Sequence, residues 1–144
     1  MKDQEEMDNI VYEEMMRLSQ QGDAAVEEDD FDAAIHCFRQ ALDLIPEPYQ
    51  EWEASTWVLF SLGEAQFFNE EFADAKESLA AVMHCPGAVG NPLIHLRLGQ
   101  AQFELGNLKR AKDELMRAYM GKGEEIFDGE DEKYISYLKQ EVDL

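Results

Sequence analysis

A segment of 21 residues occurs twice in the chain, at residues 62–82 as LGEAQFFNEEFADAKESLAAV and at residues 98–118 as LGQAQFELGNLKRAKDELMRA. Eight positions are identical, and most of the others are conservative replacements. Apolar residues in both copies recur at spacings of three and four, which is typical of amphipathic helices. A short internal repeat with a helical period indicates stacked helical units and not a catalytic motif.

The same helical periodicity runs along almost the whole sequence, and turn-forming residues divide it into paired segments. We expect helices at about residues 5–28 and 31–45, 50–69 and 72–84, and 91–105 and 108–120, so that the first helix of the second pair is lengthened. The acidic run at residues 27–30 is expected to supply the N-cap of the helix that follows it. A last amphipathic segment at about residues 131–142 is expected to cap the third pair. Together these segments predict one all-α domain over residues 1–144.

Small residues occupy equivalent positions in the three pairs, where two antiparallel helices can approach closely only if the facing side chains are short. They are Gly22, Ala24 and Ala34, then Gly63, Ala65 and Ala75, then Gly99, Ala101 and Ala111. Bulky residues are expected to fill the rest of each seam, namely Leu18, Phe31 and Phe38, then Leu62, Phe72 and Leu79, then Leu98, Leu108 and Leu115. One such pair cannot bury its apolar face alone, so the pairs are expected to stack.

This pattern resembles the tetratricopeptide repeat, a unit of about 34 residues with a Leu-Gly pair, small residues on both helices, an aromatic residue before the second helix and a closing proline. The matching residues are Leu62-Gly63, Leu98-Gly99, Ala34, Ala75, Ala111, Phe31, Phe72, Leu108, Pro46 and Pro86, whereas Gln66 and Gln102 replace the usual tyrosine. The resemblance implies three repeats at about residues 15–48, 50–88 and 91–121. They would stack as a short right-handed solenoid with the capping helix at the C-terminal end. It also implies a non-enzymatic protein that binds other proteins.

Charge narrows the class of partner. The chain has 32 acidic and 12 basic residues and a net charge of -20. Such a surface repels phosphate groups, so neither nucleic acid nor an anionic membrane is an expected partner, and a basic protein is expected instead. There is no apolar run long enough to span a membrane and no signal-peptide pattern, which favours a cytoplasmic location.

The many carboxylates are not accompanied by the sequence motifs that catalysis would need. No partner histidine, serine nucleophile motif or phosphate-binding glycine loop accompanies them. The pairs His36-Cys37 and His84-Cys85 resemble half of a metal site, but adjacent helical residues point about 100° apart and rarely hold one ion. We therefore expect no catalytic residues, no metal site and no cofactor, and we expect Cys37 and Cys85 to be buried free thiols.

In the tetratricopeptide repeat family the first helix of each pair lines a concave surface where partners bind. The resemblance therefore implies a groove formed by Asp23, Glu27, Trp57, Phe60, Glu64, Phe67, Phe68, Arg97, Gln100 and Phe103. Aromatic anchors inside an acidic rim would suit a basic partner. The alternative is that a helix or the terminal cap covers these rings. If the aromatic face is bare in the free protein, it also allows self-association.

Family members that bind chaperones hold a terminal carboxylate with Lys, Asn and Arg. Here Ser19, Asp23, Ser61 and Glu64 lie near those places and only Arg97 is kept, so this clamp is not expected. Small acidic members of the family suggest two bacterial roles: an immunity protein that neutralises a toxin domain, or a chaperone or adaptor for a secreted protein. The segment GEEIFDGEDEKYISYLK at residues 123–139 resembles the tails of short repeat proteins found beside Rhs-type toxins, which favours immunity.

Overall fold

The computed structural model describes residues 7–144, and every regular element in this range is helical. The α-helices are α1 (Asn9–Glu27), α2 (Phe31–Leu44), α3 (Glu53–Phe68), α4 (Phe72–Val82), α5 (Pro92–Glu104), α6 (Leu108–Lys122) and α7 (Glu132–Glu141). Two 3-10 helices, η2 (Tyr49–Glu51) and η3 (Glu124–Phe127), precede α3 and α7. The predicted all-α class and the three helix pairs are confirmed, although residues 5 and 6 of the first expected helix lie outside the described residues.

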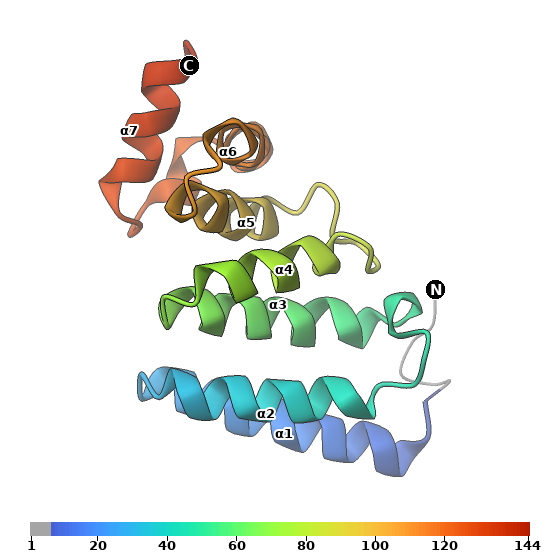
Figure 1. Ribbon diagram of the computed structural model, residues 1–144. Coiled ribbons are helices and arrows are strands. Elements are labelled where there is room, and N and C mark those ends of the chain that lie inside the picture. The colour runs from blue at the N-terminus through green and yellow to red at the C-terminus, as the bar shows by residue number, and fades with distance from the viewer. Residues whose placement is uncertain (1–6) are drawn as a thin grey trace. The chain divides into compact units, whose positions relative to one another are not determined.

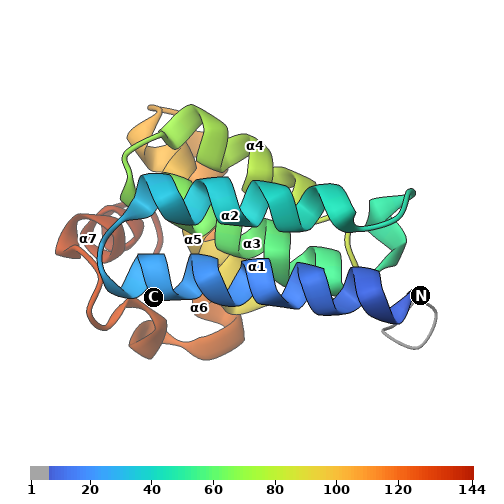
Figure 2. The same cartoon turned by 90° about the horizontal axis from the view of Figure 1, so that it is seen from below.

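The chain divides into two compact units, Met1–Ala88 and Val89–Leu144. In the first unit α1 pairs with α2, α3 pairs with α4, and α2 also packs against α3 (Figures 1 and 2). In the second unit α5 pairs with α6, and η3 and α7 pack against α6. Whether residues 1–144 form a single domain stays a prediction.

Polar side chains define where several helices begin. Asp8 accepts hydrogen bonds from the backbone N–H groups of the first turn of α1, and Asn91 does the same for α5. Asp30, in the acidic run, accepts one from the backbone N–H of Ala33, which confirms the predicted N-cap of α2. Such caps satisfy N–H groups that have no partner inside the helix.

The expected start of the first helix of the second pair, at about residue 50, is wrong. The chain instead forms η2 and then takes an extended backbone at Trp52, where φ is -99° and ψ is 134°, so that α3 begins only at Glu53. This break places the indole of Trp52 in the apolar core of the first unit, together with Met7, Met15 and Ile45. Burial of the large ring compensates for the interrupted helix.

The small-residue seams predicted from the repeat are confirmed at their centres. A Cβ atom added to Gly22 would lie 2.6 Å from the Phe38 ring, and one added to Gly63 would lie 2.7 Å from Leu79 Cγ. At Gly99 the same atom would lie 2.9 Å from Leu115 Cγ. In all three pairs the helices therefore approach so closely that a side chain would displace its neighbour.

Two seam assignments were wrong. Ala24 is exposed, because α1 is the first helix of its unit and packs chiefly against α2, which leaves its other side uncovered. Leu108 is 45% exposed. Phe103, the ring that could have covered it, packs instead on the tyrosines of α7, with ring centroids 5.4 Å from both Tyr134 and Tyr137.

The cysteines are both free, as expected, but only Cys85 is fully buried and Cys37 is half-buried. Burial raises the pKa of the Cys85 thiol, which keeps it protonated at neutral pH. Cys85 therefore acts as an apolar packing residue.

Candidate functional site

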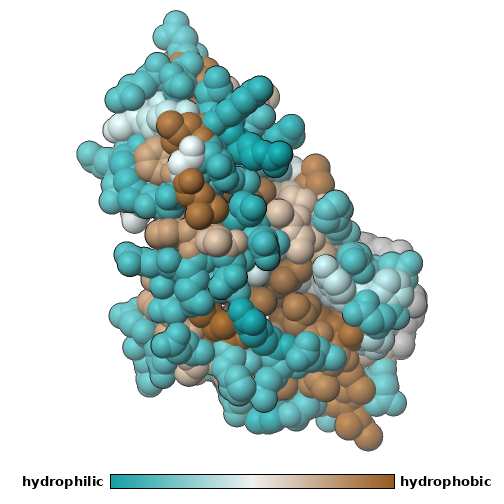
Figure 3. All heavy atoms as spheres, viewed as in Figure 1, coloured by the Kyte–Doolittle hydropathy of each residue, from teal (hydrophilic) through white to brown (hydrophobic). Residues whose placement is uncertain are grey.

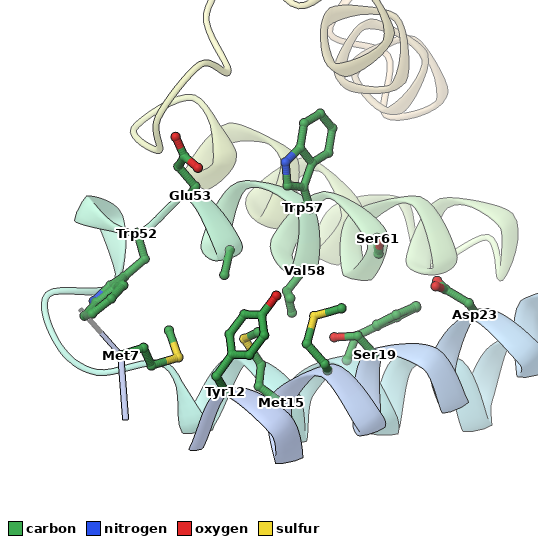
Figure 4. Close-up of a pocket in the computed structure, with 13 residues that line it drawn as sticks. Met7, Tyr12, Met15, Ser19, Asp23, Trp52, Glu53, Trp57, Val58 and Ser61 are labelled. Atoms are coloured by element: carbon green, nitrogen blue, oxygen red, sulfur yellow. The ribbon is translucent and has the colours of Figure 1, made fainter. Parts of the chain in front are cut away.

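A pocket with a volume of about 390 Å³ opens in the first unit between α1 and α3 (Figure 4). Pockets of this size are typical of ligand-binding sites in proteins. Helix α1 contributes Tyr12, Met15, Met16, Ser19 and Asp23; α3 contributes Glu53, Ala54, Trp57, Val58 and Ser61; and Met7, Phe38 and Trp52 complete the lining.

Helical spacing explains why these side chains share one pocket. The lining residues of α1 and α3 are spaced one, three or four positions apart, so each set forms a stripe along one side of its helix. Of the ten residues predicted to form a groove, only Asp23 and Trp57 line this pocket, and the rest of its lining was not predicted. The spacing of these residues along the two helices was the sequence signal that could have revealed the pocket.

The floor and the rim of the pocket are mainly apolar. Met15, Phe38 and Val58 are buried beneath it, whereas Trp57 is 58% exposed. An indole exposed to this extent is available to a partner and can be buried by one. Figure 3 shows that hydrophilic side chains cover much of the viewed face, with apolar side chains gathered around α1 and α2.

The other end of the pocket is polar. Ser19 and Asp23 on α1 and Ser61 on α3 lie there, away from the end formed by Met7 and Trp52 (Figure 4). The Ser19 hydroxyl oxygen is buried and has no hydrogen-bond partner among the described residues. Partial burial of the carboxyl group, followed by the neighbouring charge of Glu27, raises the pKa of Asp23.

Three predicted aromatic site residues of the first unit lie outside this pocket, namely Phe60, Phe67 and Phe68. Phe60 and Phe67 are buried, although Phe60 was expected to face away from the core. The physical reason is that α3 is an inner helix of its unit, with α2 and α4 packed against it, which leaves only a narrow strip of α3 exposed. Phe68 is 41% exposed and packs on the rings of Phe31 and Phe67, with centroids 5.8 and 5.7 Å away.

The remaining acids of the predicted site differ in exposure. Glu27 is exposed near the polar end of the pocket, on the same helix as Asp23, whereas Glu64 on α3 is half-buried. The structure therefore brings Asp23, Trp57 and Glu27 into one region of the first unit and places Phe68 at the far end of α3.

In the second unit the predicted site residues are covered by the C-terminal segment. Arg97 Nη1 donates to Glu130 Oε1 at 2.6 Å, and Gln100 Nε2 donates to the same oxygen at 2.7 Å. Both donors are buried, and Phe103 is half-buried beneath the tyrosines of α7. The alternative that the terminal cap covers the aromatic rings therefore holds for Phe103, which packs on Tyr134 and Tyr137 of α7.

The histidine of α5 is a packing residue. The backbone N–H of Gly90 donates to His95 Nε2 at 2.9 Å, and His95 Nδ1 lies 2.5 Å from Glu114 Oε2. Within residues 7–144 no three His, Cys, Asp or Glu side chains are arranged to hold a metal ion. None of the helices in that part of the chain is long and apolar enough to cross a membrane.

Two segments of the chain, residues 18–48 and 93–120, match the family model of the tetratricopeptide repeat. They correspond to the first and third predicted repeats; the α3–α4 pair between them has the same glycine seam at Gly63. No curated protein sequence matches the chain.

Among the solved structures similar to the chain are two at 19% identity and a TM-score of 0.66. One is the first TPR of Spaghetti (RPAP3) bound to the HSP90 peptide SRMEEVD, with 89% of this chain and 92% of that chain covered. The other is the first TPR domain of human RPAP3, with 88% of each chain covered. At this identity the likeness shows the fold. Repeats of this kind form scaffolds with concave binding surfaces. The chain therefore contains tetratricopeptide repeats and has the tetratricopeptide repeat fold.

Proposed function

We propose that the protein is a non-enzymatic interaction module that binds a basic protein domain through the pocket between α1 and α3. One observation carries the proposal: the pocket is mainly apolar, its lining includes the acids Asp23 and Glu53, and none of the described residues that line it is a lysine or arginine. Apolar anchors give affinity, and complementary charge gives orientation and a fast encounter. The net charge of -20 supports the same kind of partner.

An acidic peptide is disfavoured as the partner. The peptide bound to the similar RPAP3 repeat, SRMEEVD, has three acids and one base. In this protein such a peptide would meet Asp23 and Glu53 in the pocket, and like charges placed together reduce affinity. Arg97, the base retained from the carboxylate clamp, is bonded to Glu130. These contacts favour a basic partner over the chaperone-linked role.

We propose further that the basic partner is a toxin domain and that the protein is its immunity protein in the bacterial cytoplasm. A toxin domain that acts on a polyanionic substrate carries a basic surface, and an acidic protein can cover such a surface. The second candidate is a chaperone for a secreted protein, which the size and apolar lining of the pocket would also suit. The two differ in what is bound: a folded domain for immunity, an extended segment for the chaperone.

The test is to measure binding to the product of the neighbouring gene and to repeat the measurement with Trp57→Ala. Because Trp57 is exposed, its truncation should cost little stability, yet it should weaken binding by about 2 kcal/mol, or roughly 30-fold. Met120→Ala is the matched control, since Met120 is 74% exposed in the second unit. Equal affinities of both variants and the unchanged protein would refute the proposed pocket.

A cellular assay separates the two roles. Co-expression of the protein should rescue bacteria from the toxic product of the neighbouring gene. The Trp57→Ala variant should rescue them poorly. Phe68→Ala tests whether the contact extends to the far end of α3. If the neighbouring product is harmless by itself and binds only as an unfolded segment, the chaperone role replaces immunity.

A further inference from the structure

The pocket also indicates which side chain of the partner it receives, an inference that rests on the proposed function. We propose that the polar end of the pocket, formed by Ser19, Asp23 and Ser61, binds a lysine side chain of the partner. The alkyl stem of this lysine lies over the apolar part of the pocket, beside Met15 and Val58.

The polar groups at this end of the pocket can accept hydrogen bonds from a donor on the partner. The Ser19 oxygen is buried without a partner among the described residues, and a buried hydroxyl in that state carries a desolvation cost that a ligand can remove. Asp23 and Ser61 supply further acceptors at the same end (Figure 4). Within residues 7–144 the pocket lining offers no cationic side chain that could donate to them.

The position of these groups favours an ammonium over a guanidinium group. Ser19 and Asp23 project from α1, whereas Ser61 projects from α3, so the acceptors lie on two walls of the pocket. A lysine ammonium is compact and has three rotatable donors that can reach acceptors on different sides. The planar guanidinium group of arginine is best suited to binding a single carboxylate through two parallel hydrogen bonds.

The apolar part of the pocket suits the rest of a lysine side chain. Lysine buries its methylene groups along apolar surface while its charge stays near polar atoms. Met15 and Val58 form a buried apolar floor that the stem can cover. The volume of about 390 Å³ leaves room for an apolar neighbour of the lysine as well.

The state of Asp23 in the free protein agrees with this assignment. Partial burial and the charge of Glu27 raise the pKa of its carboxyl group, as expected for an acid without a compensating cation. An ammonium bound beside it would favour the ionised form and lower the pKa. Binding of the predicted side chain therefore has a second readout at the carboxyl group itself.

The test uses three capped peptides, acetyl-Leu-Lys-Leu-amide and its norleucine and arginine counterparts, titrated into the full chain and followed by nuclear magnetic resonance. The lysine peptide should bind about tenfold more tightly than the norleucine peptide, with shifts at Ser19, Asp23 and Ser61. Asp23→Asn should abolish this preference. Asp43→Asn should preserve it, because Asp43 is an exposed aspartate of α2 outside the pocket.

Three results would overturn the inference: equal binding of the lysine and norleucine peptides, equal loss in the Asp23→Asn and Asp43→Asn variants, or tighter binding of the arginine peptide. A fall in the pKa of Asp23 on addition of the lysine peptide supports it, and an unchanged pKa contradicts it. If the protein partner still depends on Trp57 while the lysine preference is absent, the proposed function stands and this inference fails. If the lysine preference is present but no partner needs the pocket, the proposed function fails instead.

Discussion

The close approach of α5 and α6 at Gly99 can be tested with the smallest side chain that adds a Cβ atom. In Gly99→Ala this atom would lie 2.9 Å from both Cγ and Cδ2 of Leu115 and 3.0 Å from the Leu115 backbone nitrogen. The side chain could rotate away, but Leu115 is fully buried and its backbone is fixed in α6. The two helices must therefore separate or the methyl group must be compressed.

Two opposing effects set the magnitude. Alanine is favoured over glycine inside a helix by about 1 kcal/mol, whereas overpacking typically costs about 1–3 kcal/mol. Gly99→Ala should thus reduce the free energy of unfolding by about 0–2 kcal/mol, and Gly99→Leu should cost about 3 kcal/mol. Urea unfolding followed by far-ultraviolet circular dichroism measures both values.

A second substitution identifies the cause. Leu115→Ala removes the two closest side-chain contacts of the new methyl group and keeps its 3.0 Å contact with the backbone nitrogen. In that background Gly99→Ala should cost at least about 1 kcal/mol less, which appears as a coupling energy in a double-mutant cycle. If Gly99→Ala alone stabilises the protein by about 1 kcal/mol, as at an open helical position, the seam is not tight and the reasoning is wrong.

Three other features of the second unit give predictions. Glu130→Ala should cost about 1–3 kcal/mol and speed amide hydrogen exchange in α7, because the buried donors Arg97 and Gln100 lose the carboxylate oxygen that they share; the exposed Glu132→Ala should change exchange little. Burial, followed by nearby carboxylates, raises the pKa of Tyr134, so its contribution to stability is complete below about pH 10 and is lost as the pH rises further. Tyr134→Phe should remove that part of the alkaline loss in unfolding experiments. Nitrogen chemical shifts should show the ring proton of His95 on Nδ1, since Nε2 accepts from a backbone N–H; a proton on Nε2 would contradict this.

Helix positions and seams could be predicted because both depend on local sequence. The turn residues Asp30, Gly106 and Asn107 separate periodic segments, and Gly99 lies at the same place in its repeat as Gly63. These signals act over a few residues or recur at a fixed spacing. The structure therefore departs from the expected helices mainly at η2, where burial of a single tryptophan side chain interrupts the helix.

The exposed face of α3 could not be predicted in the same way. This helix is apolar nearly all round, and a helix of that kind is buried on most sides without a preferred polar face. Phe60 and Trp57 are both large apolar residues, yet one is 7% exposed and the other 58%. The difference comes from the helices packed on either side of α3, which the sequence of α3 does not contain.

The cover over Arg97 was unpredictable for another reason. Its partner Glu130 lies 33 positions away, and the chain has 32 acidic residues from which a partner could come. Charge balance alone cannot select one of them. Only the path of the chain through η3 brings this carboxylate to α5.

Total charge and the position of one charge carry different information about binding. The 32 acids act together at long range, where salt screens interactions beyond about 8–10 Å, so added salt should slow association with a basic partner. Asp23 acts at contact inside the pocket, where screening is weaker and dissociation is the step affected. Salt should therefore slow association of the unchanged protein and of Asp23→Asn alike, while the ratio of their dissociation rates persists. Stopped-flow measurements at several salt concentrations give both rates. If the ratio of the two dissociation rates approaches one as salt rises, Asp23 contributes only to electrostatic steering. The pocket then binds apolar side chains and has no specific site for a cation.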